Sequence, residues 1–403
     1  MRTNTTLFSL LLSSGLLFLG CTNKPSSSQE PISETTFPVT LPFETGIGTE
    51  QTVTLSQIAR EVKIIPLETT DQCLLPAIIK NSITLCGHNL YIPTQKQVFQ
   101  FTDEGKFVRT VARMGQGPGE YTGIRFISTD DVSKQVFLMD HGKLLAYSGN
   151  GEFMNECKFP FAWQFSALND STFASYIYNN TGNKLFRLLI INSKGDTLTS
   201  FPQYDRFTIP SGLNFYLWGK CDKYLYRFQN QVCMKEYYND TVFTVRPDTL
   251  LPRYILQLGK YKLPKEKRFE VLDGNWNVYE TTASNYLRPD ILETPGYLFI
   301  PYTSWNVTDK SEAPRLAMYD KQKGQLFGVK DGMIQNDMYG KVPFYPAMRV
   351  ADDVLLYYWE ASDILELAEE DPELKNIPEL KDLKADDNPV IMIVRTKQVA
   401  QNL

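Results

Sequence analysis

The chain has 403 residues, with 41 Lys and Arg against 46 Asp and Glu. Aromatic residues make up 13% and charged residues 22% of the sequence, which excludes a disordered, collagen-like or coiled-coil protein. The net charge of −5 argues against general binding to a nucleic-acid backbone, because such binding needs clustered positive charge. The length alone fits two or three domains, or one large repeat domain.

The first 21 residues have the pattern of an export signal. Arg2 supplies a positive charge, and the apolar stretch at 7–19 is too short to span a bilayer. The stretch ends in Leu-Phe-Leu-Gly-Cys at 17–21, which resembles the bacterial lipobox, where a signal peptidase cuts before a cysteine that carries lipid. We therefore expect residues 1–20 to be a lipoprotein signal peptide and Cys21 to carry the lipid anchor. An ordinary secretory signal with a chance cysteine is the alternative.

Residues 21–50 are predicted to form a flexible tether. They contain a Pro- and Ser-rich run at 25–29, prolines at 38 and 42, and two glycines. The folded domain is expected to be residues 51–403. No later stretch is long and apolar enough for a transmembrane helix.

A β-hairpin recurs along residues 51–403. Apolar runs at 98–101 and 107–111 flank a turn at 103–105, and two further strands are expected upstream, at 83–85 and 90–92. Each repeat therefore has four strands. The third strands are centred on Phe99, Leu145, Leu189, Phe243, Leu316 and Ile391. The first two spacings, 46 and 44 residues, match a four-stranded propeller blade, and the longer later spacings indicate insertions.

The sequence thus predicts an all-β fold, a six-bladed β-propeller of four-stranded antiparallel blades. The sixth repeat stops at Leu403 without a fourth strand, and the strand at 61–67 has no repeat of its own. Pairing this N-terminal strand with the last repeat would close the ring and cover the strand edges. Seven blades are the alternative if residues 261–290 hold a degenerate repeat.

Residues 361–386 interrupt the β pattern. Leu and Ile recur there among Glu and Lys in a helical pattern, and Pro372 and Pro378 divide it into short pieces. This small helical insertion would lie between the second and third strands of the last blade. It would serve as a lid over apolar surface or, alternatively, as a partner-docking element.

Several of these segments together resemble a known family. They are Ile-Pro-Leu-Glu-Thr at 65–69, Gly-Gln-Gly-Pro-Gly-Glu-Tyr at 115–121, the acidic Leu-rich insertion and Asp-Asn-Pro at 387–389. They are similar to the six-bladed β-propeller lipoproteins of Bacteroides and relatives, which are in turn similar to NHL and TolB-like propellers. The resemblance spans residues 50–403 and implies a propeller in the bacterial cell envelope, anchored in the outer membrane, with no catalytic residue carried over. No acidic run follows Cys21, which favours the periplasmic side over the cell surface.

Five cysteines remain besides Cys21, namely Cys73, Cys86, Cys157, Cys221 and Cys233. Cys221 and Cys233 have the spacing of a hairpin disulfide, which an oxidising compartment permits, but buried free thiols are the favoured alternative. The cysteines form no CxxC motif and the chain has only two histidines, so no metal or other cofactor is expected.

The glycines at 115–121 do not indicate a nucleotide site. Their spacing is GxGxG, Pro118 lacks a backbone donor and no helix is expected to follow. We expect a tight link between two blades, with Glu120 and Tyr121 as the contact residues if the loop binds a ligand. His141 should share this rim and His88 should face the opposite side. Because a lone rim histidine is more often an exposed turn residue, no catalytic residue is assigned.

The inner strands should line a central channel. Their early positions are Lys80, Arg125, Gln164, Tyr216, Arg288 and Arg349. Converging guanidinium groups would bind the carboxylate, sulfate or phosphate groups of an anionic or glycan ligand. The alternative is that these arginines only pair with aspartates of the channel. Aromatic residues near the loops, Trp163, Trp218, Tyr286 and Trp305, would stack on sugar rings or, alternatively, serve only in the packing of the blades.

Two functions fit these features. The favoured one is a lipid-tethered, non-enzymatic scaffold that binds a glycan, an anionic small molecule or another envelope protein. The alternative, which the NHL-like resemblance allows, is a propeller hydrolase or lyase with a metal at the channel mouth. The inner strands carry no evident ring of carboxylates for such a metal.

Overall fold

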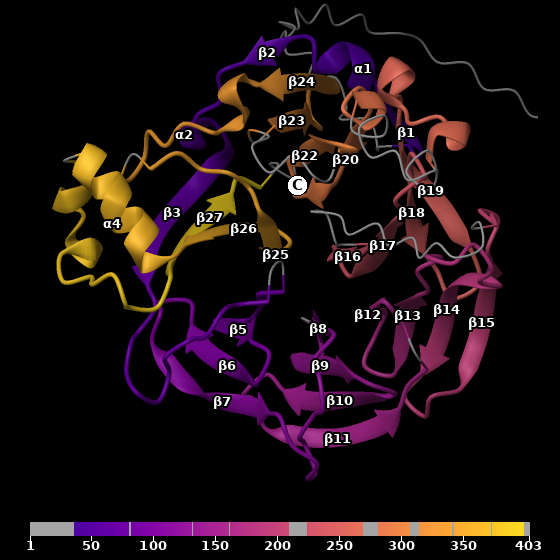
Figure 1. Cartoon of the computed structure of the whole chain (residues 1–403), viewed down its shortest axis with the longest axis horizontal. Coiled ribbons are helices and arrows are strands. Elements are labelled where there is room, and N and C mark those ends of the chain that lie inside the picture. The colour runs from indigo at the N-terminus through magenta and orange to yellow at the C-terminus, as the bar shows by residue number, and fades with distance from the viewer. Residues whose placement is uncertain are drawn as a thin grey trace, which may run out of the picture. The chain divides into compact units, whose positions relative to one another are not determined.

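The computed structural model describes residues 36–398, apart from 80–81, 131, 161, 209–223, 269–280, 307–312, 314, 341 and 372. Six small antiparallel sheets stand around a central axis, each with its first strand nearest the axis (Figure 1). The fold is a six-bladed β-propeller, which confirms the interpretation of the repeat.

The strands of each blade are given in order from the innermost to the outermost. Blade 1 consists of β4 (Thr84–Cys86), β5 (Asn89–Pro93), β6 (Gln97–Thr102) and β7 (Phe107–Arg113). Blade 2 consists of β8 (Phe126–Asp130), β9 (Gln135–Asp140), β10 (Lys143–Ser148) and β11 (Phe153–Lys158). Blade 3 consists of β12 (Gln164–Ala167), β13 (Thr172–Tyr176), β14 (Phe186–Asn192) and β15 (Thr197–Pro202). Blade 4 consists of β16 (Leu225–Phe228), β17 (Gln231–Lys235), β18 (Thr241–Val245) and β19 (Leu250–Leu256). Blade 5 consists of β20 (Leu287–Pro289), β21 (Leu292–Glu293), β22 (Tyr297–Ser304), β23 (Arg315–Asp320) and β24 (Gln325–Val329). Blade 6 consists of β25 (Met348–Ala351), β26 (Val354–Trp359), β27 (Val390–Thr396) and β3 (Ala59–Pro66).

The apolar core lies between neighbouring blades. In β9, Leu138 packs with Tyr91 of blade 1, whereas Phe137 meets Phe173 of blade 3 with ring centroids 5.1 Å apart. Successive side chains of a strand point to opposite faces of its sheet, and here both faces are covered. This explains why the central strands appear in the sequence as continuous apolar runs rather than as an alternation of apolar and polar residues.

The ring has two faces, which we name by the connections they carry. The link face carries the links between blades, such as residues 114–125, and the turns between second and third strands, such as that of His141. The turn face carries the other turns, such as those of His88 and residues 103–105. His88 and His141 therefore lie on opposite faces, as predicted from the sequence.

The N-terminal strand closes the ring. Strand β3 pairs antiparallel with β27, with Ile65 opposite Ile391 and Val62 opposite Val394. Blade 6 thus takes its outer strand from one end of the domain and its third strand from the other.

The chain joins the ring earlier than the sequence suggests. Residues 37–51 are called the strap below. All but the last were expected within the tether, but they contain β1 (Val39–Leu41), α1 (Phe43–Gly46) and β2 (Glu50–Gln51). Strand β1 adds in parallel to β19 and β2 in parallel to β24, so the strap crosses the outer edges of blades 4 and 5. Helix α2 (Leu55–Ile58) then leads into β3.

The helical insertion lies where the sequence places it, after β26. It contains α4 (Ala361–Glu370) and the single 3-10 turns η4 (Leu374–Asn376) and η5 (Pro378–Leu380). The side chains of Ile364, Ile377 and Leu380 join the apolar cluster between blades 5 and 6, as a lid over apolar surface requires. Single 3-10 turns also occur at η1 (Gly259–Tyr261) and η3 (Lys330–Gly332).

Cys233 is a buried free thiol on β17, and its partner in the suggested disulfide, Cys221, lies outside the described residues. Burial raises the pKa of the Cys233 thiol to about 12.

Candidate functional site

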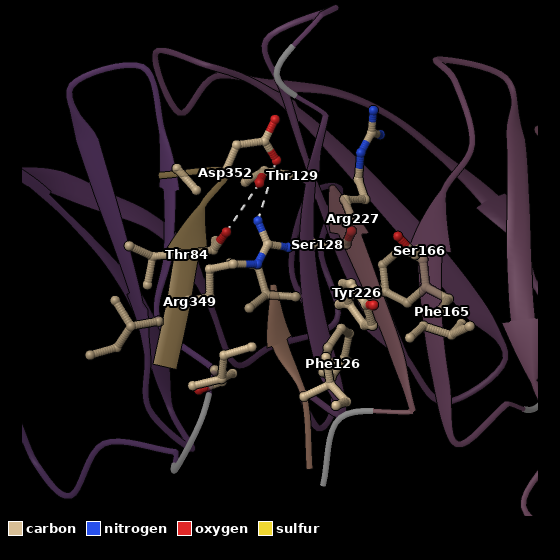
Figure 2. A pocket seen from close by; sticks show the side chains of 18 residues that line it. Thr84, Phe126, Ser128, Thr129, Phe165, Ser166, Tyr226, Arg227, Arg349 and Asp352 are labelled. Carbon is tan, nitrogen blue, oxygen red and sulfur yellow. Dashed lines mark hydrogen bonds and ion pairs between the residues drawn. The ribbon is translucent and has the colours of Figure 1, made fainter. Parts of the chain in front are cut away.

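A narrow cavity of about 90 Å³ lies in the central channel, and its walls come from all six blades. Hydroxyl groups line much of it, from Ser82, Thr84, Ser128, Thr129 and Ser166 (Figure 2). Since one water molecule needs roughly 10–15 Å³ of cavity volume, the cavity has space for several water molecules or one small polar group.

Two arginines line the cavity, and both have aspartate partners. Arg227 of β16 lies 2.9 Å from a carboxylate oxygen of Asp130 and donates to the Ala167 carbonyl oxygen at 2.8 Å. Arg349 of β25 donates to Asp352 at 3.3 Å. Although burial alone would raise the pKa of Asp130, hydrogen bonds from Ser133 and the charge of Arg227 hold it below its usual range.

The three arginines expected to converge do not line one cavity. Of Arg125, Arg288 and Arg349, only Arg349 lines the channel cavity. Arg125 is exposed on the link face, where its Nε donates to Nδ1 of His141 at 3.4 Å. Arg288 is buried and its side chain lies in a different cleft, between blades 4 and 5. Arg125 precedes β8 and Arg288 is the second residue of β20, so both lie where the chain enters from the preceding blade, and their side chains need not face the axis.

Gln164 has a structural partner rather than an open position in the channel. It is buried at the start of β12, and its side-chain oxygen accepts hydrogen bonds from the backbone N–H groups of Tyr224 and Leu225. It thereby fastens blade 3 to blade 4. Three other predicted site residues, Lys80, Tyr216 and the lipidation residue Cys21, lie outside the described residues, as does Trp218.

The glycine loop is a link between blades 1 and 2. Its carboxylate, Glu120, accepts the Gly117 N–H at 2.8 Å, and Gly119 has a φ of +73°, which favours glycine. Tyr121 is fully buried, in the core between the two blades. Both proposed contact residues therefore support the loop itself. The loop does share the link face with the exposed His141, as predicted.

A larger cleft of about 240 Å³ opens between blades 4 and 5. Its described lining contains five cationic side chains against two carboxylates: Lys235, Lys262, Lys265, Arg268 and Arg288 against Asp205 and Asp240. Most of these residues precede an inner strand or follow a second strand, which places the cleft on the link face.

Aromatic rings and guanidinium groups are interleaved along this cleft. The rings of Tyr238 and Trp305 stack with centroids 4.9 Å apart, and the Arg268 guanidinium lies 3.5 Å from the centre of the Tyr238 ring. Arg288 donates to the hydroxyl of Tyr237 at 2.7 Å. The exposed Tyr204 extends the aromatic surface toward a neighbouring pocket beside blade 3. Stacked rings with cations beside them suit a ligand that has both flat apolar faces and negative charge.

Sequence reasoning found Arg288 and Trp305 but missed their neighbours. Tyr237 and Tyr238 lie in the turn after β17, and Arg268 lies in the long link that follows β19. The pairing of adjacent tyrosines beyond a strand end was a usable signal. No sequence signal indicated Arg268, because its proximity to Tyr238 depends on the path of an irregular link.

Within the described part of the chain, no three His, Cys, Asp or Glu side chains gather closely enough to hold a metal ion. None of the described helices has the length and apolar character needed to cross a membrane.

Comparison with known proteins agrees with this architecture. A family model described as "Domain of unknown function (DUF4934)" matches residues 38–395. A crystal structure of a Bacteroides fragilis NCTC 9343 protein described as exported superposes with a TM-score of 0.68 at 18% identity, covering 89% of this chain and 99% of that one. A protein from Bacteroides caccae gives a TM-score of 0.37 at 11% identity, over 63% of this chain and 83% of that one. At these identities the first likeness concerns the fold alone. No curated protein matches the sequence.

Proposed function

Since this chain is a member of the DUF4934 domain family, and since its link face carries a cationic, aromatic cleft, we propose that it is a non-enzymatic binding protein of the bacterial cell envelope. In this proposal Cys21 carries a lipid that holds the propeller at the outer membrane, on its periplasmic side. The ligand is an acidic glycan, and it binds in the cleft between blades 4 and 5.

One observation carries the choice of ligand, namely the excess of five cations over two carboxylates beside the stacked Tyr238 and Trp305. Sugar rings present apolar faces that pack on aromatic side chains, and uronic acid carboxylates accept hydrogen bonds from guanidinium and ammonium groups. Such a cleft in a protein with a net charge of −5 concentrates positive potential where the ligand enters. The NHL-like resemblance supports the propeller scaffold for this role.

The test measures calorimetric binding of the full-length protein to oligogalacturonate, with the neutral oligosaccharide maltohexaose for comparison. We expect saturable binding of the acidic oligosaccharide that weakens as salt rises, and little binding of the neutral one. Lys265→Glu places a negative charge on an exposed position of the cleft and should weaken binding by about three- to tenfold, which corresponds to about 0.7–1.4 kcal/mol.

The matched control is Lys194→Glu, an equal change of charge on an exposed turn of the opposite face. Equal effects of the two substitutions would point to the overall charge rather than to the cleft. A second pair tests the aromatic surface: Tyr204→Ala should weaken binding, and Leu198→Ala, similarly exposed in blade 3, should not. Cleavage of the oligosaccharide together with a stoichiometric metal ion, detected by elemental analysis and lost on chelation, would replace this proposal with the hydrolase or lyase alternative.

A further inference from the structure

The channel cavity contains an arginine, Arg349, whose hydrogen-bond donors are only partly paired with protein groups. The side chain of Arg349 is 8% exposed, and its one ion pair in the described chain is the contact of 3.3 Å with Asp352. Asp352 is 45% exposed and also accepts the Gln229 N–H at 3.0 Å. The aspartate is therefore shared with a backbone donor and with solvent, and it does not saturate the guanidinium.

The remaining donors of Arg349 have hydroxyl groups around them. A guanidinium carries five N–H donors in a fixed plane, and burying them without acceptors costs free energy. Figure 2 shows Arg349 reaching from β25 into the middle of the side chains that line the cavity. In the described chain the hydroxyls of Ser128 and Ser166 make no hydrogen bond, while those of Thr84 and Thr129 bond to each other at 3.0 Å.

The second arginine of the cavity differs in its surroundings. Arg227 has a carboxylate of Asp130 at 2.9 Å and a carbonyl oxygen at 2.8 Å, and Asp130 is 98% buried. Arg227 is thus neutralised within the protein wall. Among the described residues that line the cavity, Arg349 remains as the cation whose donors face it.

We propose that the channel cavity is a binding site for a small oxyanion group, held by the Arg349 guanidinium and by the hydroxyls of Ser128 and Ser166. A carboxylate, phosphate or sulfate group matches the planar fork of a guanidinium and accepts further bonds from hydroxyls. The volume of about 90 Å³ suits one such group and a few waters. The group is either a free inorganic anion or the charged end of a larger molecule that enters the channel. This site is separate from the cleft between blades 4 and 5, so the two tests have independent outcomes.

The test uses the full-length protein and two probes, inorganic phosphate and phenyl phosphate, at constant ionic strength set with sodium chloride. Binding is followed by calorimetry and by the shift in melting temperature. Saturable binding of phosphate itself supports a free anion as the ligand, and binding of phenyl phosphate alone supports a charged group on a larger molecule. No saturable binding of either probe overturns the proposal.

Arg349→Gln should weaken binding at least about tenfold, because it removes a charge-assisted hydrogen bond. The matched control is Arg60→Gln. It removes the ion-pair partner of Asp353, which follows Asp352 in the sequence and does not line the cavity, and it should leave binding unchanged. Equal losses in the two variants overturn the proposal. If Arg349→Gln does not fold, Ser128→Ala decides: a loss of about two- to fivefold supports the site, and unchanged affinity overturns it. Crystals soaked in selenate should show the anomalous signal within hydrogen-bonding distance of Arg349.

Discussion

Glu293 of β21 is fully buried and yet charged, because its oxygens have partners from blades 4 and 5. Arg253 donates to it from two nitrogens, at 2.6 and 3.0 Å, and Lys321 donates at 2.8 Å. The hydroxyls of Tyr226 and Tyr254 complete the set. Although burial alone would raise the pKa of Glu293, the charge of Lys321 and the hydrogen bonds and charge of Arg253 lower it to about 2.

This shift predicts a pH dependence of stability. The pKa of Glu293 is lower in the folded state than its ordinary value of 4.5, so its contribution is complete above about pH 4.5 and is lost as the pH falls toward 2. The contribution at neutral pH is about 3 kcal/mol. Glu293→Gln should destabilise the protein at pH 7, since it leaves Arg253 and Lys321 without their carboxylate, and it should flatten the fall in stability at acid pH.

Urea unfolding at pH 7, 4.5 and 3 measures both effects. The half-exposed Glu156, paired with Lys143 on the surface, supplies the control, because Glu156→Gln should change stability by less than about 1 kcal/mol at every pH. Parallel pH profiles for Glu293→Gln and the unaltered protein would show that this carboxyl does not govern the acid transition.

At the scale of residues, the sequence predicted which types of side chain lie in the channel better than it predicted which individual residues they are. The expectation of arginines and aspartates near the axis agrees with the Arg349–Asp352 and Arg227–Asp130 pairs. Arg227 was missed because the sequence register placed the inner strand of blade 4 at Tyr216, whereas β16 begins at Leu225. Which face of a short strand turns toward the axis depends on the twist of the whole blade, and no local pattern encodes it.

Among the elements, the strands were predictable and the strap was not. Third strands such as β6, β10 and β14 are six or seven residues long and have clear turns beside them, whereas β1 has three residues and α1 four. Elements of that length have no periodicity to detect. Their structure comes from distant partners: Leu41 and Phe43 are fully buried in the core of blades 4 and 5, and the Phe43 ring meets Tyr302 at 5.3 Å.

The strap should therefore contribute stability out of proportion to its length. Phe43→Ala should lower the free energy of unfolding by about 3–5 kcal/mol, because it leaves a cavity between two blades. Phe37→Ala, at the half-exposed start of the same segment, should cost about 1 kcal/mol. Urea denaturation of both variants provides the comparison. Equal and small losses would mean that the strap rests on the ring without being part of its core.

On the scale of the whole molecule, the fold was predictable because each blade repeats a similar local pattern. The closure was predictable too, since an unmatched strand at one end and an incomplete repeat at the other leave a single simple pairing. The long links that follow β15 and β19 were not, because they lack repeated sequence, and the cleft of about 240 Å³ is built largely from such connections.

Ring closure predicts a strict requirement for β3. A chain that begins at residue 68 would leave the edge of β27 bare and the apolar partners of Ile64 and Ile65 exposed, so it should not unfold cooperatively on heating. Adding residues 37–67 as a separate peptide should restore a cooperative transition. A chain that begins at residue 52 lacks the strap but keeps β3, so it serves as the control and should still unfold cooperatively. If the chain from residue 68 melted at the same temperature, the closing strand would be dispensable.

The parallel pairing of β1 with β19 also determines how the ring responds to tension at the N-terminal side of Phe37. A force there would act along the direction of β1, across the hydrogen bonds that join Leu41 and Glu44 to Gln257. These bonds would be loaded in shear and would have to rupture together, instead of unzipping one after another. If residues upstream hold the protein to a surface, the attachment resists mechanical pulling before any blade begins to open.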